Sequence, residues 1–154
     1  MGENEISESK DKNNSSLLIE WAVWTHLISK TDPEIMLLKG HLLIEVGLES
    51  VLKCNGINEP ENFSFYKKVT ILENIVPDNC TDKFLIIQSL KELNKLRNKL
   101  AHDFHFKMED EELAQWSQAI LKHFKGQKWT NYTYRTKIAH SFSVLSKNIW
   151  DLIH

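Results

Sequence analysis

The sequence has little glycine, proline or cysteine, and it has no long apolar run. Five glycines and three prolines in 154 residues leave too little material for the many tight turns of an all-β fold. The two cysteines, Cys54 and Cys80, stand in neither metal-binding nor redox spacing, so we expect free thiols in a reducing compartment. No apolar stretch approaches the roughly 20 residues that cross a bilayer, and the polar N-terminus lacks the apolar segment of a signal peptide. We therefore expect a cytoplasmic protein.

The composition is that of an ordinary globular chain with an uneven charge distribution. Hydrophobic residues make up 42% and charged residues 26%, enough for one core in one domain of this length. The net charge is −2, but residues 1–62 carry 11 acidic and 5 basic side chains, whereas residues 63–154 carry 10 acidic and 14 basic ones. If the protein binds a polyanion, the second half is the expected surface. A solvated basic face explains the same excess.

Helix signals recur along most of the chain and predict an all-α, antiparallel bundle of about five to six helices. Asp32 before Pro33 is an N-cap followed by a proline at the first helical position, and Gly56 and Gly126 are suitable terminators. Residues 1–14 are polar and predict a disordered tail. The expected domain is 15–154, with a core over about 16–125 and a C-terminal helix over about 130–153. The other helices are expected over about 16–30, 33–54, 63–75, 82–103 and 108–126.

An arginine interrupts the apolar stripe of the helix predicted over 82–103. At about 100° per residue, Arg97 lies only about 40° from Leu93, among the leucines of that stripe. An unpaired cation away from water is costly, so Arg97 needs an anion, a wet cleft or a subunit interface. The alternative is that its aliphatic stem passes the leucines and its charge reaches water.

The helix predicted over 33–54 offers a partner for this arginine. His41 and Glu45 lie in the middle of its apolar face, which suggests a bidentate pair between Glu45 and Arg97. His41 is then a supporting residue of the same site, or else a core histidine whose hydrogen bonds are satisfied.

Arg97 and His102 are about 140° apart on an ideal helix, so they do not share one face. Three arrangements bring them together. The helix frays or bends near His102, the length of the arginine spans the gap, or two copies of the chain meet across a two-fold axis.

The stretch "RNKLAH", residues 97–102, resembles the signature of the HEPN superfamily, in which an arginine and a polar residue precede a histidine in a helical bundle. The segments "KGHLLIEVGLESVL" and "FSFYKKVTILENI" resemble the second and third helices of bacterial HEPN proteins. The resemblance covers about residues 16–125. It implies a HEPN-like bundle that forms a homodimer with the two motifs facing one another. It also implies RNA cleavage without a metal or another cofactor, as a toxin of a toxin–antitoxin pair or an antiviral effector.

Carried over by residue, the resemblance gives Arg97 the role of stabilising the phosphorane. His102 is the general acid or base, and Asn98 orients the phosphate or the histidine. A histidine that titrates near neutrality and a fixed guanidinium suit this chemistry. Some HEPN toxins carry a tyrosine, which an antitoxin modifies, two residues after the histidine. This chain has Phe104 there, so an antitoxin is expected to act by binding.

A different class of function competes with the ribonuclease. The chain is then a catalytically silent HEPN module that mediates protein contacts or regulation. Net acidity favours this alternative, because nucleic-acid binding depends on cations. The complete Arg97, Asn98 and His102 set favours the enzyme.

Weaker signals concern RNA contacts and metal ligands. The segment "GQKWTNYTYRTK" interleaves bases and aromatics, on which nucleobases stack, although such aromatics also serve as core or dimer contacts. The stretch "HDFH" offers His102, Asp103 and His105 without a distant fourth ligand, so we predict no metal site. The residues expected to contact RNA are Lys95, Lys99, Lys128, Tyr132, Tyr134 and Arg135.

Overall fold

The computed structural model describes residues 2–102 and 112–153, and over these residues the chain is all-α, as predicted, with no strand. Within this part of the chain no helix combines the length and the apolar character needed to span a membrane. Both cysteines are free. The helices are α1 (Gly2–Ile28), α2 (Pro33–Cys54), α3 (Phe65–Ile75), α4 (Lys83–His102), α5 (Glu112–His123) and α6 (Tyr134–Trp150), with short 3-10 turns at Pro60–Asn62 and Asp151–Ile153.

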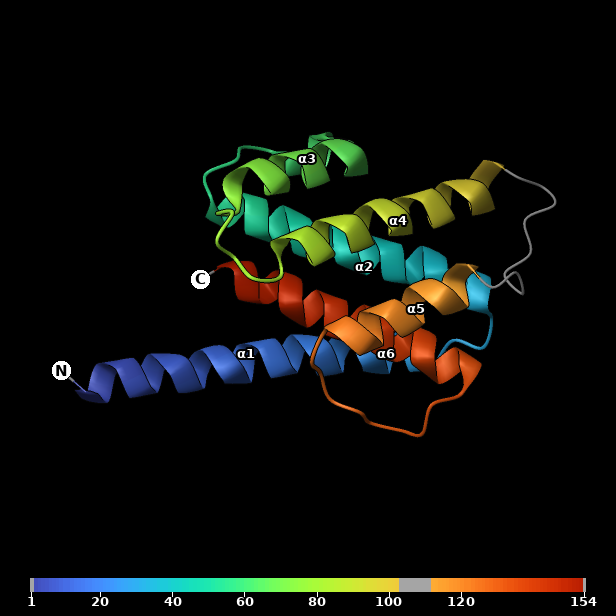
Figure 1. The fold of residues 1–154 in the computed structure, drawn as a ribbon, viewed down its shortest axis with the longest axis horizontal. Helices are drawn as coiled ribbons and strands as arrows, with labels where there is room; N and C mark the ends of the chain where they lie inside the picture. Colours follow the sequence, from blue (N-terminus) through green and yellow to red (C-terminus); the bar gives the residue numbers. More distant parts are fainter. Residues whose placement is uncertain (1, 103–111, 154) are drawn as a thin grey trace.

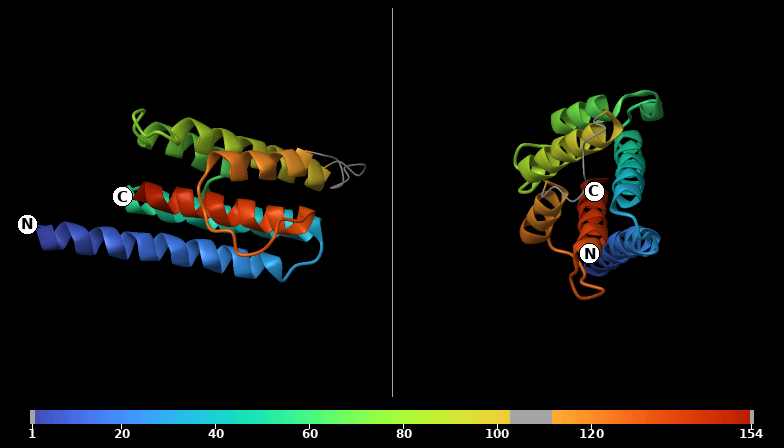
Figure 2. Two further views of the ribbon diagram at one scale, coloured as in Figure 1. Left: turned by 60° about the horizontal axis from the view of Figure 1, so that its bottom comes forward. Right: turned by 90° about the vertical axis from the view of Figure 1, so that its right-hand side faces the viewer.

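Helix α6 forms the centre of the bundle. It packs against α1, α2 and α5, and α3 and α4 pair with one another and with α2 on one side (Figures 1 and 2). Every residue from Ile138 to Ser146 is buried. The C-terminal helix is therefore an integral part of the core, which extends well beyond the predicted range of about 16–125.

Side-chain caps fix several helix starts. Asp32 accepts a hydrogen bond from the Glu34 amide at 2.9 Å, which confirms the predicted start of α2. Helix α6 begins at Tyr134, four residues after the predicted start. The reason is a capping box in which Thr133 and Thr136 bond one another's backbone amides, holding the preceding residues outside the helix.

Helix α1 begins far upstream of its predicted start at residue 16. It runs from Gly2 to Ile28, so residues 2–14, which were predicted to be disordered, continue the helix. No proline interrupts this stretch, and acidic residues near a helix N-terminus favour the helix dipole. Figure 1 shows this part of α1 projecting past the other helices.

A close helix crossing depends on Gly40. A Cβ atom at this position would lie 2.6 Å from two ring atoms of Phe142 on α6, and that ring is fully buried. We expect Gly40→Ala to destabilise the fold by about 1–3 kcal/mol through overpacking. A thermal unfolding experiment measures the effect.

Gly47 provides the matched control on the same helix. A Cβ atom there would come no closer than 4.0 Å to Ile149, so Gly47→Ala should raise stability by about 0.5–1 kcal/mol through helix propensity. Equal effects of the two substitutions would contradict the close crossing.

Candidate functional site

Helix α4 carries the "RNKLAH" residues as one regular helix. Leu90, Leu93 and Leu96 are buried and fix the orientation of the helix against the core. Arg97 is half-buried, while Asn98 and His102 are exposed. The structure therefore places Arg97 at the edge of the core and the other two residues in water.

Within one chain, Arg97 and His102 face different directions. The helix continues to His102, so it does not fray before the histidine, and the angle of about 140° between the two positions stands. Among the described residues no hydrogen bond or ion pair joins them. Two arrangements remain that bring them together: the length of the arginine, or a second copy of the chain.

The carboxylate of Glu45 binds a lysine of α3, so the predicted Glu45–Arg97 pair is wrong. Lys68 Nζ lies 2.6 Å from Glu45 Oε1 and 2.8 Å from Glu49 Oε1. The lysine side chain is only 2% exposed, against 23% and 22% for the two carboxylates. In the part of the chain that is described, no ion pair contains Arg97, so its guanidinium has no carboxylate partner there.

His41 of α2 lies within electrostatic range of Arg97. It is buried, and its ring stacks on Phe65 with centroids 4.2 Å apart. Burial lowers the pKa of His41, and the positive charges of Arg97 and Lys68 lower it further. The negative charge of Glu45 and the nearby Asn94 amide act in the opposite direction. The net effect is a pKa of His41 below the usual histidine value, which favours the neutral imidazole next to a cation.

The Nε2 atom of His41 is buried without a hydrogen-bond partner among the described residues. The prediction of a fully satisfied core histidine therefore does not hold for this atom. Asn94, which is half-buried one turn before Arg97, belongs to the same group. His41, Asn94 and Arg97 thus form a polar cluster between α2 and α4.

Lys99 and Lys95 have different environments on α4. Lys99 Nζ lies 2.7 Å from both carboxylate oxygens of Glu112 and so connects α4 to α5. Lys95 is exposed, and no ion pair of the described residues contains it. Of these two predicted RNA contacts, Lys95 is the one without an ion pair among the described residues.

The residues predicted to contact RNA near the start of α6 make contacts within the protein. Arg135 donates to the carbonyl oxygens of Ile28 at 2.7 Å and Lys30 at 2.9 Å, which caps the end of α1. The Lys128 ammonium lies 4.3 Å from the Tyr132 ring centroid. In Figure 1 the α5–α6 loop lies across the bundle from the end of α4, so these residues do not extend the Arg97 surface.

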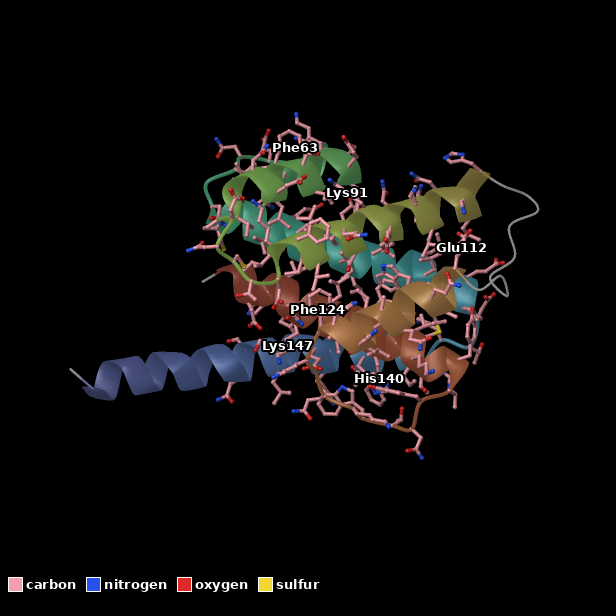
Figure 3. The ribbon with its side chains drawn as sticks, viewed as in Figure 1. Phe63, Lys91, Glu112, Phe124, His140 and Lys147 are labelled. Atoms are coloured by element: carbon pink, nitrogen blue, oxygen red, sulfur yellow. The ribbon has the colours of Figure 1, made fainter. Side chains whose placement is uncertain are left out.

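Tyr134, another predicted RNA contact, is the first residue of α6 and is partly exposed. The loop before it is held by two buried residues. His140, labelled in Figure 3, accepts a hydrogen bond from the Trp129 amide at 2.9 Å through Nε2, and its Nδ1 lies 2.6 Å from the Thr136 carbonyl oxygen. Glu20 on α1 accepts from the Gln127 amide. The two contacts of His140 require a neutral imidazole whose proton is on Nδ1.

Acid should destabilise the fold through these histidines. Burial lowers the pKa of His140, as does the Lys128 charge, against a raising contribution from the Thr136 carbonyl. An unfolded histidine titrates near about 6.5, so below about pH 6.5 the unfolded chain binds protons that the folded chain does not. The free energy of unfolding should therefore decrease as the pH is lowered, and His41 acts in the same direction.

Urea unfolding at about pH 7.5 and 5.5 measures this effect. Burial raises the pKa of Glu20, so this residue stabilises the fold as the pH falls and opposes the effect of the histidines. The comparison is therefore made in a Glu20→Gln background, because the glutamine oxygen still accepts the hydrogen bond from Gln127. A midpoint that is equal or higher at the lower pH would refute the expectation. His140→Gln should reduce the difference between the two pH values.

The sequence analysis missed Asn94, a member of the polar cluster, and Lys68, which binds Glu45 beside it. Lys68 occupies a helical stripe with Phe65, Val69 and Leu72, all buried. A lysine in an apolar stripe is the same signal that singled out Arg97, so the pattern was readable. The metal candidates Asp103 and His105, together with Phe104, lie outside the described residues.

Comparison of the chain with protein-family models, with curated proteins and with solved structures returned no match.

Proposed function

We propose that this chain is a cytoplasmic HEPN-type endoribonuclease that acts as a homodimer without a metal. Arg97, Asn98 and His102 are the proposed catalytic residues, with His41 in support. Glu45, whose carboxylate binds Lys68, is not part of the proposed site. The toxin of a toxin–antitoxin pair or an antiviral effector is the proposed biological role, and any antitoxin acts by binding.

The observation that carries the proposal is the environment of Arg97. Arg97 is half-buried, its charge acts on the buried His41, and Lys68 already occupies the carboxylate of Glu45. A half-buried arginine without a carboxylate partner in the described part of the chain is available for an external anion. A phosphate group suits its planar, bidentate donors.

The proposed chemistry is attack of a ribose 2′-hydroxyl on the adjacent phosphorus. A base removes the 2′-hydroxyl proton, the new P–O bond forms, and the 5′-oxygen leaves with a proton from an acid. His102 acts as one of these two groups, since histidine exchanges protons near neutral pH. Arg97 stabilises the charge that develops on the phosphorane oxygens. The products are a 2′,3′-cyclic phosphate and a 5′-hydroxyl.

A homodimer reconciles the two directions in which Arg97 and His102 face. We propose that Arg97 of one chain and His102 of the other form each site. In support, α2, which also carries His41, has an exposed apolar stripe, and each of its four residues is 40–59% exposed. Exposed apolar surface of this kind favours association. The stripe consists of Ile35, Leu38, Leu42 and Val46.

Incubation of the purified protein with total RNA in EDTA tests the function. We expect cleavage, fragments that end in 2′,3′-cyclic phosphate, and no cleavage of DNA, which lacks the 2′-hydroxyl. Absence of cleavage from every RNA tested would refute the enzyme and favour the catalytically silent interaction module. Cleavage that EDTA stops would refute the metal-independent mechanism.

A further inference from the structure

A groove between α3 and α4 adjoins the polar cluster around Arg97. It has a volume of about 450 Å³, and Figure 3 places the labelled Lys91 on α4 beside α3. Its lining combines aromatic rings, two amides, two cations and one carboxylate. The main lining residues are Phe65, Tyr66, Val69, Lys91, Asn94 and Lys95.

Tyr66 is an exposed ring on a fixed backbone. It is 66% exposed, although it lies in the first turn of α3, where Ser64 caps the helix by accepting from the Lys67 amide at 3.2 Å. Its neighbour Phe65 is buried against His41, which anchors this turn. An exposed ring held by such a helix provides a surface on which a nucleobase can stack.

The groove leads toward the proposed catalytic residues along α4. Lys91, Lys95, Asn98 and His102 follow one another at spacings of three or four residues and so share one face of the helix. From Lys91 to His102 this face is about 16 Å long, at about 1.5 Å per residue. Asn94 lines the groove and also belongs to the polar cluster with His41 and Arg97, so it connects the two.

The charges of this face suit a phosphate backbone. Lys95 is in no ion pair among the described residues. Lys91 lies 3.2 Å from Glu73, with side chains that are 48% and 43% exposed, and such an exposed pair is weak. Glu92 also lines the groove and opposes an anion, and the hydrogen bond that it accepts from Gln88 at 3.3 Å leaves its negative charge in place.

We propose that the α3–α4 groove is the subsite that holds single-stranded RNA beside the cleavage point. One base stacks on Tyr66, and the phosphates next to it contact Lys95 and Lys91. This subsite rests on the proposed ribonuclease function and specifies the path of its substrate. It also places the main RNA contact away from Lys128 and Tyr132, which lie on the α5–α6 loop.

Fluorescence anisotropy with a labelled 2′-O-methyl 12-mer of mixed sequence tests the subsite, because this probe cannot be cleaved by 2′-hydroxyl attack. Tyr66→Ala should weaken binding roughly 5- to 100-fold, the effect of losing one stacked base, whereas Tyr66→Phe should bind as the wild type does. Lys95→Ala should weaken binding and reduce the slope of log affinity against log salt by about 1.

Phe84→Ala is the matched control, since Phe84 is a 74% exposed ring at the opposite end of α4; it should leave binding unchanged. If the wild-type protein binds the probe and the Tyr66→Ala and Lys95→Ala variants bind it equally well, the subsite alone is overturned. The subsite is also overturned if the wild-type protein does not bind the probe. If both variants lose binding of the probe while the wild-type protein cleaves no RNA, the groove is supported as an RNA-binding site and the ribonuclease function is overturned.

Discussion

His102→Ala should reduce RNA cleavage by roughly 10²–10⁴-fold, the usual contribution of one general acid or base. The substitution should leave stability almost unchanged, because His102 is exposed at the last residue of α4. Initial rates on a fluorescent RNA oligonucleotide in EDTA measure the loss. A thermal unfolding curve establishes that the variant is folded.

His123 gives a closely matched control for this experiment. It is also an exposed histidine at the last residue of a helix, α5, so His123→Ala should cleave RNA at the wild-type rate. If His102→Ala kept more than about a tenth of the wild-type rate, His102 would not be the proton-transfer group. Equal losses in both variants would point to a general effect on the protein.

Lys68→Ala should cost about 3 kcal/mol of stability, the lower end of the range for breaking a buried ion pair. Removal of this buried cation leaves Glu45 and Glu49 beside one another without their partner. The lower end applies because both carboxylates keep about a fifth of their surface in water. For a chain of this size we expect a fall in Tm of about 6–12 °C.

Two further variants separate the charge effect from a general effect of losing a lysine. Lys67 is an exposed neighbour, and Lys67→Ala should change stability by less than about 1 kcal/mol. The triple variant Lys68→Met with Glu45→Gln and Glu49→Gln removes all three charges and should recover most of the loss. A Lys68→Ala protein as stable as Lys67→Ala would show that the ion pairs of Lys68 with Glu45 and Glu49 contribute little to stability.

Much of the fold follows from local signals in the sequence. The Asp32–Pro33 start defines α2, and the apolar stripe of α4 predicts the burial of Leu90, Leu93 and Leu96. Ile87 is also buried, although it lies outside this stripe. The central position of α6 was not predictable in this way, because its middle carries serines as well as apolar residues. Ser141 and Ser143 bond carbonyl oxygens of their own helix at 2.7 and 2.8 Å, which satisfies their hydroxyls and lets them pack as small core residues.

The candidate site shows the limit of a helical wheel. The wheel identified Arg97 as unusual, and the structure places it at the edge of the core. It did not identify the element opposite each face, so it paired Glu45 with Arg97, whereas Lys68 of α3 occupies that carboxylate. Three-dimensional packing decides between two cations that compete for one anion, and helical periodicity does not contain that information.

Subunit mixing tests the central claim, that Arg97 of one chain and His102 of the other form each site. Arg97→Ala and His102→Ala chains with different tags are co-expressed, and the mixed dimer is purified through both tags. One of its two sites is then whole, so it should cleave RNA in EDTA at about half the wild-type rate, while each parent dimer is almost inactive. A mixed dimer as inactive as its parents, or a wild-type protein that cleaves RNA as a monomer, would contradict the claim.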